Sequence, residues 1–331
     1  MVRAQGRTVT KAPAGNASAS DIPPRATRRA SIVTAVFYLL SAIAVRLTGP
    51  RLWGILPDLL ARLQMRRLTP KAKDFVQRMR AVLGRDRDDR SLLALHQRNE
   101  AATHQRVVFV AASRRRFGWN PDVVLQGGER VEDARARGKG VILWSDPFVH
   151  FPILSKRALA EAGYWAWHLS SSGHGILNSD LADRFINHRL IEVEQRYLAG
   201  RIVFDRQTTM TATRAMMKVL AGNGLISLTN NAYVGAFVTT PFGEGMVLRL
   251  AQTPLRLAAL QGVPLLPVLT IERERFRRYE VTVGPDLSLA LPPGVANPVQ
   301  RLAAIYAAYL LDCARAEPLQ FGGWAMMRAM E

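Results

Sequence analysis

The chain has 331 residues, of which 48% are hydrophobic and 21% charged, and it contains one cysteine. This composition is sufficient for a large core and excludes a mainly disordered protein. The single Cys313 excludes an intrachain disulfide framework and a zinc site built from cysteines. No clean apolar stretch of about twenty residues occurs beyond the N-terminal region, so a channel or transporter with many spans is not expected.

The net charge of +19 is concentrated in the N-terminal third of the chain. Residues 1–120 carry 23 Lys and Arg against 7 Asp and Glu, whereas residues 121–331 carry 22 against 19. The basic residues surround the most apolar segment, residues 32–45 (IVTAVFYLLSAIAV). This pattern favours an anionic membrane surface as the partner. Nucleic acid is not expected, because the charge does not lie on an element with stacking aromatic residues.

The apolar segment is too short for a straight membrane span, because its helix would extend about 21 Å against a hydrocarbon core of about 30 Å. Residues 47–60 (LTGPRLWGILPDLL) add apolar surface, interrupted by Gly49-Pro50 and Pro57. We therefore predict a disordered basic leader over residues 1–30, followed by a membrane anchor with interfacial helices over 31–66. The alternative is a secretory signal peptide that ends near Ala42-Ile43-Ala44.

The remainder of the chain divides into a helical region and a larger α/β domain. Apolar residues recur at helical spacing on both sides of Gly84, which predicts helices over residues 67–105. From residue 106 to 325, short apolar runs alternate with helical segments, so we predict an α/β fold with a single mostly parallel sheet covered by helices. Strands are expected at residues 123–125, 141–144, 165–169, 202–204, 225–228, 265–269 and 279–283, and helices at 180–199, at 255–261 and from 298.

Four short segments follow one another in the order typical of a known enzyme family. They are residues 138–144 (GKGVILW), 224–231 (GLISLTNN), 240–243 (TPFG) and 257–269 (LAALQGVPLLPVL). Together they resemble the bacterial lipid A late acyltransferases, the Kdo-lipid A lauroyl and myristoyl transferases of the lysophospholipid acyltransferase superfamily, over residues 106–324. The resemblance implies an enzyme on the cytoplasmic face of the bacterial inner membrane. Such an enzyme moves an acyl chain from an acyl carrier protein or coenzyme A thioester to a lipid or other hydrophobic acceptor, without a cofactor.

The sequence departs from this family at the residues that carry its chemistry. The family requires a His and, five residues later, a carboxylate that orients the imidazole as it takes a proton from the acceptor. Alignment on the 140–144 strand places Pro147 and Pro152 at these two positions. A shift of three residues would use His150, but Ser155 then replaces the acid. The expected pair is therefore absent, and catalysis cannot be carried over from the family.

A different pair follows the same strand. Asp146-Pro147 resembles a helix N-cap followed by proline at the first helical position, which would place His150 one turn from Asp146. We predict that His150 is the general base and that Asp146 orients it, at the strand ends where open α/β sheets bind ligands. The alternative is structural: Asp146 caps the helix, and His150 packs among neighbouring apolar side chains.

A polar run that ends another predicted strand supplies further candidates. Residues 167–175 (WHLSSSGHG) contain His168, Ser172 and His174, which we predict to contact substrate. The spacing of the two histidines does not define a metal site, and no nucleophile motif surrounds the serines. The alternative is a loop whose hydroxyls satisfy local backbone groups.

Two more places are candidates for substrate binding. Asn230 and Asn231 follow the strand at 225–228 and would donate to a substrate carbonyl or a sugar, or else shape a turn. Glu244 lies between two glycines, where a carboxylate on a loop would be available to a ligand.

Two classes of function remain open after this sequence analysis. The first is a membrane-associated acyltransferase with altered catalytic residues. The second is a catalytically silent relative that binds lipid or acyl chains, or that scaffolds an acyl-carrier-protein partner. The resemblance supports the first class by analogy of fold.

Overall fold

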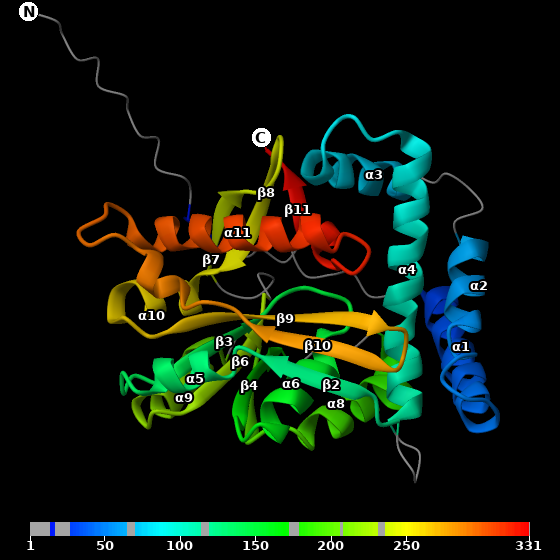
Figure 1. Cartoon of the computed structure of the whole chain (residues 1–331), viewed down its shortest axis with the longest axis horizontal. Helices are drawn as coiled ribbons and strands as arrows, with labels where there is room; N and C mark the ends of the chain where they lie inside the picture. Colours follow the sequence, from blue (N-terminus) through cyan, green and yellow to red (C-terminus); the bar gives the residue numbers. More distant parts are fainter. Residues whose placement is uncertain are drawn as a thin grey trace, which may run out of the picture.

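The computed structural model describes residues 14–16, 27–64, 70–113, 119–171, 179–205, 208–230 and 236–330. Its strands (Figure 1) are β1 (Ala14–Asn16), β2 (Asp122–Gln126), β3 (Val141–Ser145), β4 (Ala166–Ser171), β5 (Gly200–Phe204), β6 (Leu225–Thr229), β7 (Ala236–Pro241), β8 (Met246–Ala251), β9 (Leu265–Glu274), β10 (Arg278–Val283) and β11 (Met327–Ala329). The helices are α1 (Arg28–Leu47), α2 (Ile55–Gln64), α3 (Pro70–Leu83), α4 (Asp89–Ala112), α5 (Glu129–Arg135), α6 (Phe151–Glu161), α7 (Asp180–Ala182), α8 (His188–Gln195), α9 (Thr209–Ala221), α10 (Gln252–Gln261) and α11 (Pro298–Ala316).

A seven-stranded sheet in the order β2-β10-β9-β3-β6-β4-β5 forms the centre of the molecule. Neighbouring strands from β9 to β5 are parallel, whereas β10 is antiparallel to β9 and parallel to β2. The predicted α/β class is confirmed, since each of the seven predicted strands is present. Within the sheet, β3 lies between β6 and β9.

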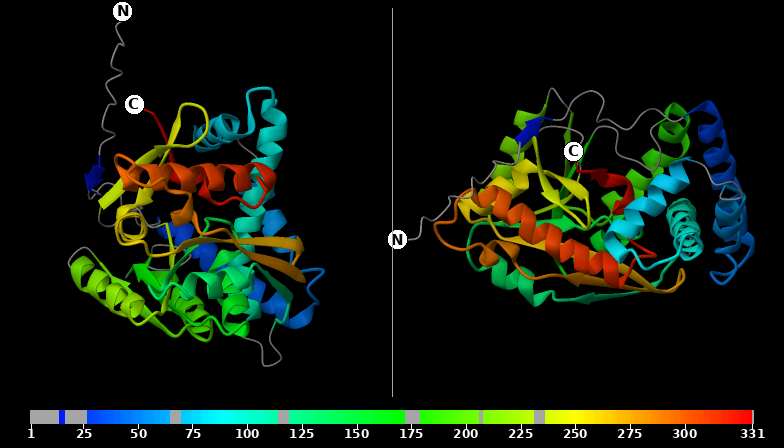
Figure 2. Two further views of the ribbon diagram at one scale, coloured as in Figure 1. Left: turned by 60° about the vertical axis from the view of Figure 1, so that its left-hand side comes forward. Right: turned by 90° about the horizontal axis from the view of Figure 1, so that it is seen from above.

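Helices cover both faces of this sheet. All residues of β3 are buried, and they alternate between two cores: Ile142 and Trp144 pack with α9, α10 and α11, whereas Val141 and Leu143 pack with α5 and α6. Figures 1 and 2 show α11 on one side of the sheet and α5, α6 and α8 on the other. Uniformly apolar strands of this kind need cover on both faces, as the sequence predicted.

A second, four-stranded sheet corrects the expectation of a single sheet. It has the order β1-β7-β8-β11, with antiparallel pairs throughout. β7 and β8 form a hairpin whose turn contains Gly243 and Gly245 at φ +78° and +64°, a conformation that favours glycine. β8 alternates buried and half-buried residues, so its strand pattern was present in the sequence. The TPFG segment, read as a family motif, ends β7 and enters the turn.

The N-terminal helices pack side by side at one edge of the molecule, with α1 and α2 against α4 (Figures 1 and 2). Among the described residues, α1 is the one helix long and apolar enough to cross a membrane by length and composition. α4 continues without a break through the predicted boundary at residues 105 and 106. Within the predicted leader, residues 14–16 form β1, which pairs with β7.

Candidate functional site

The start of β3 is fixed by an interlocked pair of turns. Gly140 has φ +66°, and a Cβ atom there would lie 2.7 Å from the carbonyl oxygen of Gly224. The Gly140 N–H donates to Oδ1 of Asn223 (3.0 Å), which itself has φ +55°. Residues 222–224 thus form the turn between α9 and β6, and the contact sets the register of β3 beside β6.

Asp146 follows β3 and is fully buried under α11. Its Oδ1 accepts a hydrogen bond from the hydroxyl of Tyr306 (2.8 Å), whose ring stacks on Trp144. Burial raises the pKa of Asp146 well above its ordinary value, although the Tyr306 hydroxyl opposes this shift. The predicted N-cap is wrong: α6 begins at Phe151, with the other proline, Pro152, in its first turn. Asp146 is therefore a buried carboxylic acid paired with a neutral hydroxyl.

His150 immediately precedes α6 and is also fully buried, but among different elements. Its ring packs against Phe109 of α4 and Tyr279 of β10, with ring centroids 5.4 and 5.6 Å apart. Its Nε2 lies 3.7 Å from Oε2 of Glu272, and neither ring nitrogen makes a hydrogen bond within the described residues. Burial lowers the pKa of His150, while the Glu272 carboxylate opposes the shift. The imidazole is consequently neutral near pH 7.

The predicted contact between Asp146 and His150 is not formed. The turn after β3 directs Asp146 into the core shared with Tyr306 and α11, and it directs His150 into the core shared with Phe109 and Tyr279. The acid near His150 is instead Glu272. The structure therefore contains a His and a carboxylate at the end of β3, but with a different carboxylate from the predicted one.

Glu272 was not predicted, although its position has a clear structural cause. Ser145 at the end of β3 pairs with Val268, and β9 continues for six more residues to Glu274, so it extends over the 146–150 turn. Glu272 Oε1 accepts hydrogen bonds from the Tyr279 hydroxyl (2.6 Å) and from the Phe276 N–H (2.9 Å). The charged LTIERERF sequence at 269–276 was the available signal, and it required knowledge of the β3–β9 register.

Gln105 connects Glu272 to a neighbouring arginine. In the amide orientation that satisfies both of its ends, Gln105 donates to Glu272 Oε1 (3.2 Å) and accepts from Nε of Arg275 (2.9 Å). Arg275 in turn donates to both carboxylate oxygens of Asp58 on α2, each at 2.8 Å. A continuous polar network therefore joins α2 to the His150–Glu272 pair.

His168 lies inside the sheet, and its Nδ1 is 2.9 Å from the Ser227 hydroxyl on the adjacent strand β6. Both side chains are buried, so in this structure His168 does not border an open site. Ser172 and His174 lie outside the described residues. Among the described residues, no group of three or more His, Cys, Asp or Glu side chains is arranged to hold a metal ion.

A buried ionic cluster lies on the same side of the sheet as His168. Glu194 of α8 accepts from Lys156 of α6 (2.8 Å) and from Arg201 of β5 (3.2 Å), and Arg201 also donates to Ser170. Glu194 is fully buried, and burial lowers the pKa of Lys156, while Glu194 opposes that shift. The cluster joins α6, α8 and two strands, and its hydrogen bonds are internal to the protein.

The remaining candidates lie away from His150. The Asn230 side chain donates to the carbonyl of Arg249 (2.8 Å) and accepts from the N–H of Ala251 (3.0 Å), which ties the end of β6 to β8. This is the turn-shaping role that the sequence left as an alternative. Asn231 lies outside the described residues.

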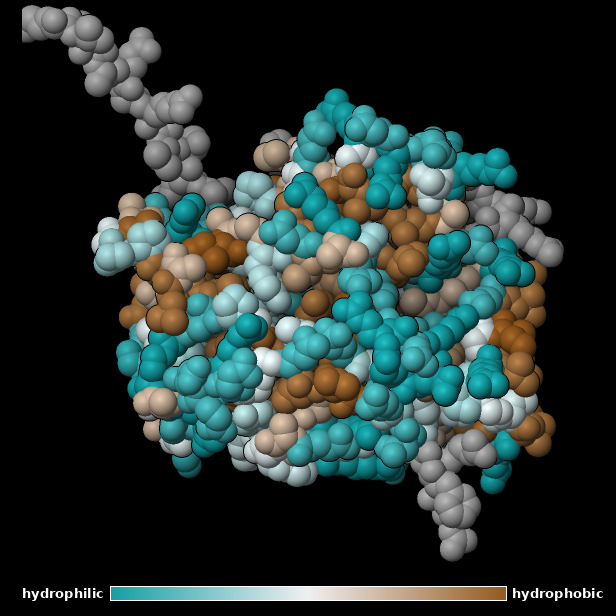
Figure 3. All heavy atoms as spheres, viewed as in Figure 1, coloured by the Kyte–Doolittle hydropathy of each residue, from teal (hydrophilic) through white to brown (hydrophobic). Residues whose placement is uncertain are grey.

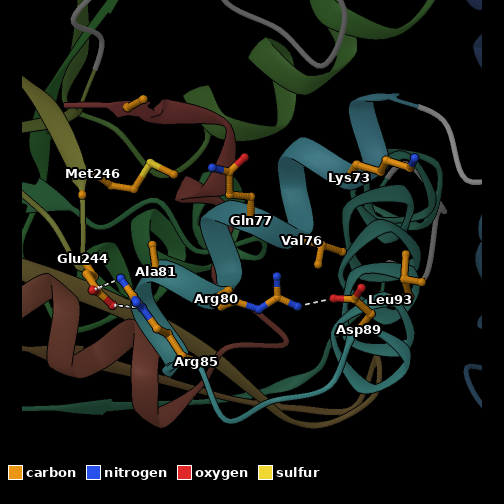
Figure 4. Close-up of a pocket in the computed structure, with 12 residues that line it drawn as sticks. Lys73, Val76, Gln77, Arg80, Ala81, Arg85, Asp89, Leu93, Glu244 and Met246 are labelled. Atoms are coloured by element: carbon orange, nitrogen blue, oxygen red, sulfur yellow. Dashed lines mark hydrogen bonds and ion pairs between the residues drawn. The ribbon is translucent and has the colours of Figure 1, made fainter. Parts of the chain in front are cut away.

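Glu244 borders a large cavity of about 1080 Å³ between α3, α4 and the β7–β8 turn (Figure 4). It pairs with Arg85 (2.9 Å to Nε), while Arg80 pairs with Asp89 across the cavity. Two of the three cations in the lining are thus neutralised by the cavity's own carboxylates; the third is Lys73. His150 and Asp146 do not line this cavity, so the structure does not bring Glu244 together with them.

A smaller apolar hollow of about 60 Å³ lies at the carboxyl ends of three parallel strands. Leu169 of β4, Phe204 of β5 and Leu228 of β6 line it, together with Met216 of α9. Four threonines also line it: Thr209, Thr213, Thr229 and Thr253. Open α/β sheets place ligands at these strand ends, and this lining suits a hydrocarbon group.

In comparisons with known proteins, no family model matches the chain, and no curated protein matches it significantly.

Proposed function

We propose that the protein is a membrane-associated acyltransferase in which His150 is the general base and Glu272 orients it. The observation that carries this proposal is the 3.7 Å separation of His150 Nε2 and Glu272 Oε2 at the carboxyl end of β3. In the lipid A acyltransferases that the sequence resembles, the corresponding strand leads to a His and a carboxylate. Here the same chemical pair comes from the β3–α6 turn and β9.

In the proposed reaction, His150 carries the proton from the acceptor hydroxyl to the leaving thiolate, and Glu272 stabilises the charged ring. Nε2, the nitrogen nearer Glu272, carries the ring proton, which leaves Nδ1 as the base. Nδ1 takes the proton of an acceptor hydroxyl while that oxygen forms a bond to the carbonyl carbon of an acyl thioester. The carbon–sulfur bond breaks, and the thiolate receives the proton from the imidazolium. Glu272 stabilises the imidazolium in between.

Several features support a lipid substrate and a membrane location. The α1–α2 surface is apolar and basic, and the small hollow beside Leu169 and Leu228 has a largely apolar lining. We infer an acyl carrier protein or coenzyme A thioester as the donor and a lipid or other hydrophobic acceptor. By the same resemblance, the site of action is the cytoplasmic face of a bacterial inner membrane, with its anionic surface.

The proposal is tested by release of free thiol from a panel of acyl-coenzyme A and acyl-carrier-protein donors in the presence of membrane lipids. His150→Ala should lower transfer by about 10²- to 10⁴-fold, the usual contribution of a positioned base. Glu272→Gln should lower it less and shift its pH profile toward lower pH, because the carboxylate that raises the pKa of His150 is gone while the hydrogen bonds from Tyr279 and Phe276 can be retained. Asp146→Asn should leave transfer unchanged, because Asp146 belongs to another core. Wild-type rates in the first two variants would refute the assignment.

The second candidate function is a silent relative that binds lipid or an acyl chain. The complete burial of His150 among the rings of Phe109 and Tyr279 favours it, since a packed histidine of this kind is often structural. This alternative predicts binding of a fatty acyl thioester without turnover by the wild-type protein. It also predicts that His150→Ala changes stability but not acyl-chain binding.

A further inference from the structure

The outer face of α1 and α2 is apolar and unpartnered among the described residues. Its large side chains are roughly half or more exposed and are Ile32, Val36, Leu39, Leu40, Ile43 and Leu47 on α1, with Ile55, Leu59 and Leu63 on α2. Figure 3 shows hydrophobic surface along the edge where Figure 1 places α1 and α2. Within residues 27–64, five exposed arginines accompany a single acid, Asp58. An apolar face with basic flanks complements an anionic bilayer.

The same helices cover the candidate site. Trp53, in the loop that leads into α2, packs edge-on against Phe276 at 5.7 Å. Phe276 packs against Phe109 at 5.5 Å, and Phe109 lies against the His150 ring. An acceptor that approaches from the α1–α2 face therefore meets Trp53 and Phe276 before it meets His150.

An exposed ion pair joins this cover to α2, in addition to the packing of α2 on α4 and of Trp53 on Phe276. Arg275 and Asp58 keep 36% and 40% of their side chains exposed, and an ion pair this accessible to water contributes little to stability. A Cβ atom on Gly54 would lie 2.5 Å from the Arg275 guanidinium, so α2 begins directly against this side chain. The phosphates of anionic lipids would compete with Asp58 for the guanidinium, which binds phosphate in bidentate fashion.

We propose that an anionic bilayer binds the α1–α2 face, exchanges Asp58 for lipid phosphate at Arg275, and separates α1 and α2 from α4 and the 275–277 turn, which loosens the Trp53–Phe276–Phe109 packing over His150. This inference rests on the proposed function, because it identifies what admits the lipid acceptor to the His150–Glu272 pair. In solution the His150–Glu272 pair stays covered and protected from water. At the membrane it becomes accessible from the lipid phase, which holds the acceptor.

The test is chemical labelling of the histidines in the full-length protein with diethyl pyrocarbonate, which modifies accessible neutral imidazoles, followed by mass spectrometry of the peptides. His150 should react slowly alone or with phosphatidylcholine vesicles. With phosphatidylglycerol vesicles its rate should rise by about tenfold or more, because labelling follows the fraction of open molecules. Exposed His188 should react in every condition, and buried His168 should remain protected in every condition.

Two variants examine the apolar α1–α2 face and the Arg275–Asp58 ion pair separately. Leu39→Asp/Leu59→Asp should abolish both flotation with phosphatidylglycerol vesicles and the gain in His150 labelling. Leu260→Asp, at a leucine similarly exposed on α10, should change neither. Asp58→Asn should increase His150 labelling without vesicles, whereas Glu192→Gln, which removes a surface ion pair on α8, should not.

Three results would overturn the inference. If the protein does not float with phosphatidylglycerol vesicles, the docking face is wrong. If it floats but His150 stays protected, the opening is wrong, and acyl transfer measured in detergent still decides the proposed function independently. If His168 is labelled together with His150, the vesicles unfold the domain and do not open one site.

Discussion

The two faces of the large sheet accommodate buried polar groups in opposite ways. Under α11, the Asp146 carboxyl meets the Tyr306 hydroxyl and no other side-chain partner among the described residues, in a core of Trp144 and other apolar side chains. On the face covered by α6 and α8, Glu194 meets two cations, and Glu272 meets a histidine and a tyrosine. Burial without a cation favours the protonated form of a carboxyl, whereas a neighbouring cation such as those beside Glu194 favours the carboxylate.

This difference indicates where proton transfer is feasible. Burial among apolar side chains raises the pKa of Asp146 and so disfavours the negative charge that would stabilise an imidazolium, which makes Asp146 unsuited to orient a base. Glu272 faces His150 and lies beside Arg275, in a region that already holds charge. Position in the sequence made Asp146 the obvious partner, but the electrostatic environment favours Glu272.

The largest expected effect is on the ionic face. Glu194→Gln removes the carboxylate that Lys156 and Arg201 share, and it leaves two buried cations without their counter-charge. Breaking a buried pair in this way costs about 3–5 kcal/mol of unfolding free energy. Urea unfolding should show this loss, whereas the control Glu192→Gln on the exposed side of α8 should change it by less than about 1 kcal/mol. If Glu194→Gln and Glu192→Gln lower the unfolding free energy equally, the Glu194 cluster is not stabilised by buried charge.

The pH dependence of stability separates the two faces directly. Because burial raises the pKa of Asp146, the folded state binds a proton there that the unfolded state releases above about pH 4. This contribution is complete below the unfolded pKa and is lost as the pH rises toward the folded one, by at most about 1.4 kcal/mol per pH unit. Asp146→Asn cannot titrate, so wild-type stability relative to this variant should fall between pH 4 and 7. A constant difference would contradict a protonated Asp146.

Removing the partner of Asp146 should have a smaller effect. Tyr306→Phe keeps the ring that stacks on Trp144 but leaves the buried carboxyl without its hydrogen bond. An unsatisfied buried polar group of this kind costs about 1–3 kcal/mol. Urea unfolding measures the loss, and an unchanged near-ultraviolet circular dichroism spectrum would confirm that the aromatic packing is retained. No loss would indicate that Asp146 finds another partner.

The large sheet could be predicted from the sequence because its strands carry a local signal. Runs such as residues 141–144 are wholly apolar, and glycines or Asn-Pro pairs separate them from the helices. The second sheet was missed although Met246–Ala251 alternates, because the TPFG segment before it was interpreted as a family motif and not as the end of a strand. A motif identified by resemblance can conceal ordinary strand periodicity.

The candidate site was predicted only in part, for a physical reason. His150 was found because it follows β3 in the chain, but Glu272 is 122 positions later. The two meet because β9 pairs with β3 and continues beyond its end. Register between distant strands depends on tertiary packing, which no local pattern records. Likewise, the apolar run at 32–45 predicted a membrane anchor, but not that α1 would pack on α4 beside the covered site.

The smallest expected effect comes from the exposed pair at the large cavity. Arg85 and Glu244 link the α3–α4 loop to the β7–β8 turn, but both keep more than half of their side chains exposed. Water already solvates both charges, so Glu244→Gln should cost less than about 1 kcal/mol of unfolding free energy, and less still in 1 M salt. The backbone contact from the Glu244 N–H to the carbonyl of Ala81 (2.8 Å) is unaffected by this change, so the turn should keep its place. Urea unfolding at low and high salt measures the effect. A loss as large as that of Glu194→Gln would mean that burial does not distinguish these two carboxylates, and the comparison between buried and exposed charge would fail.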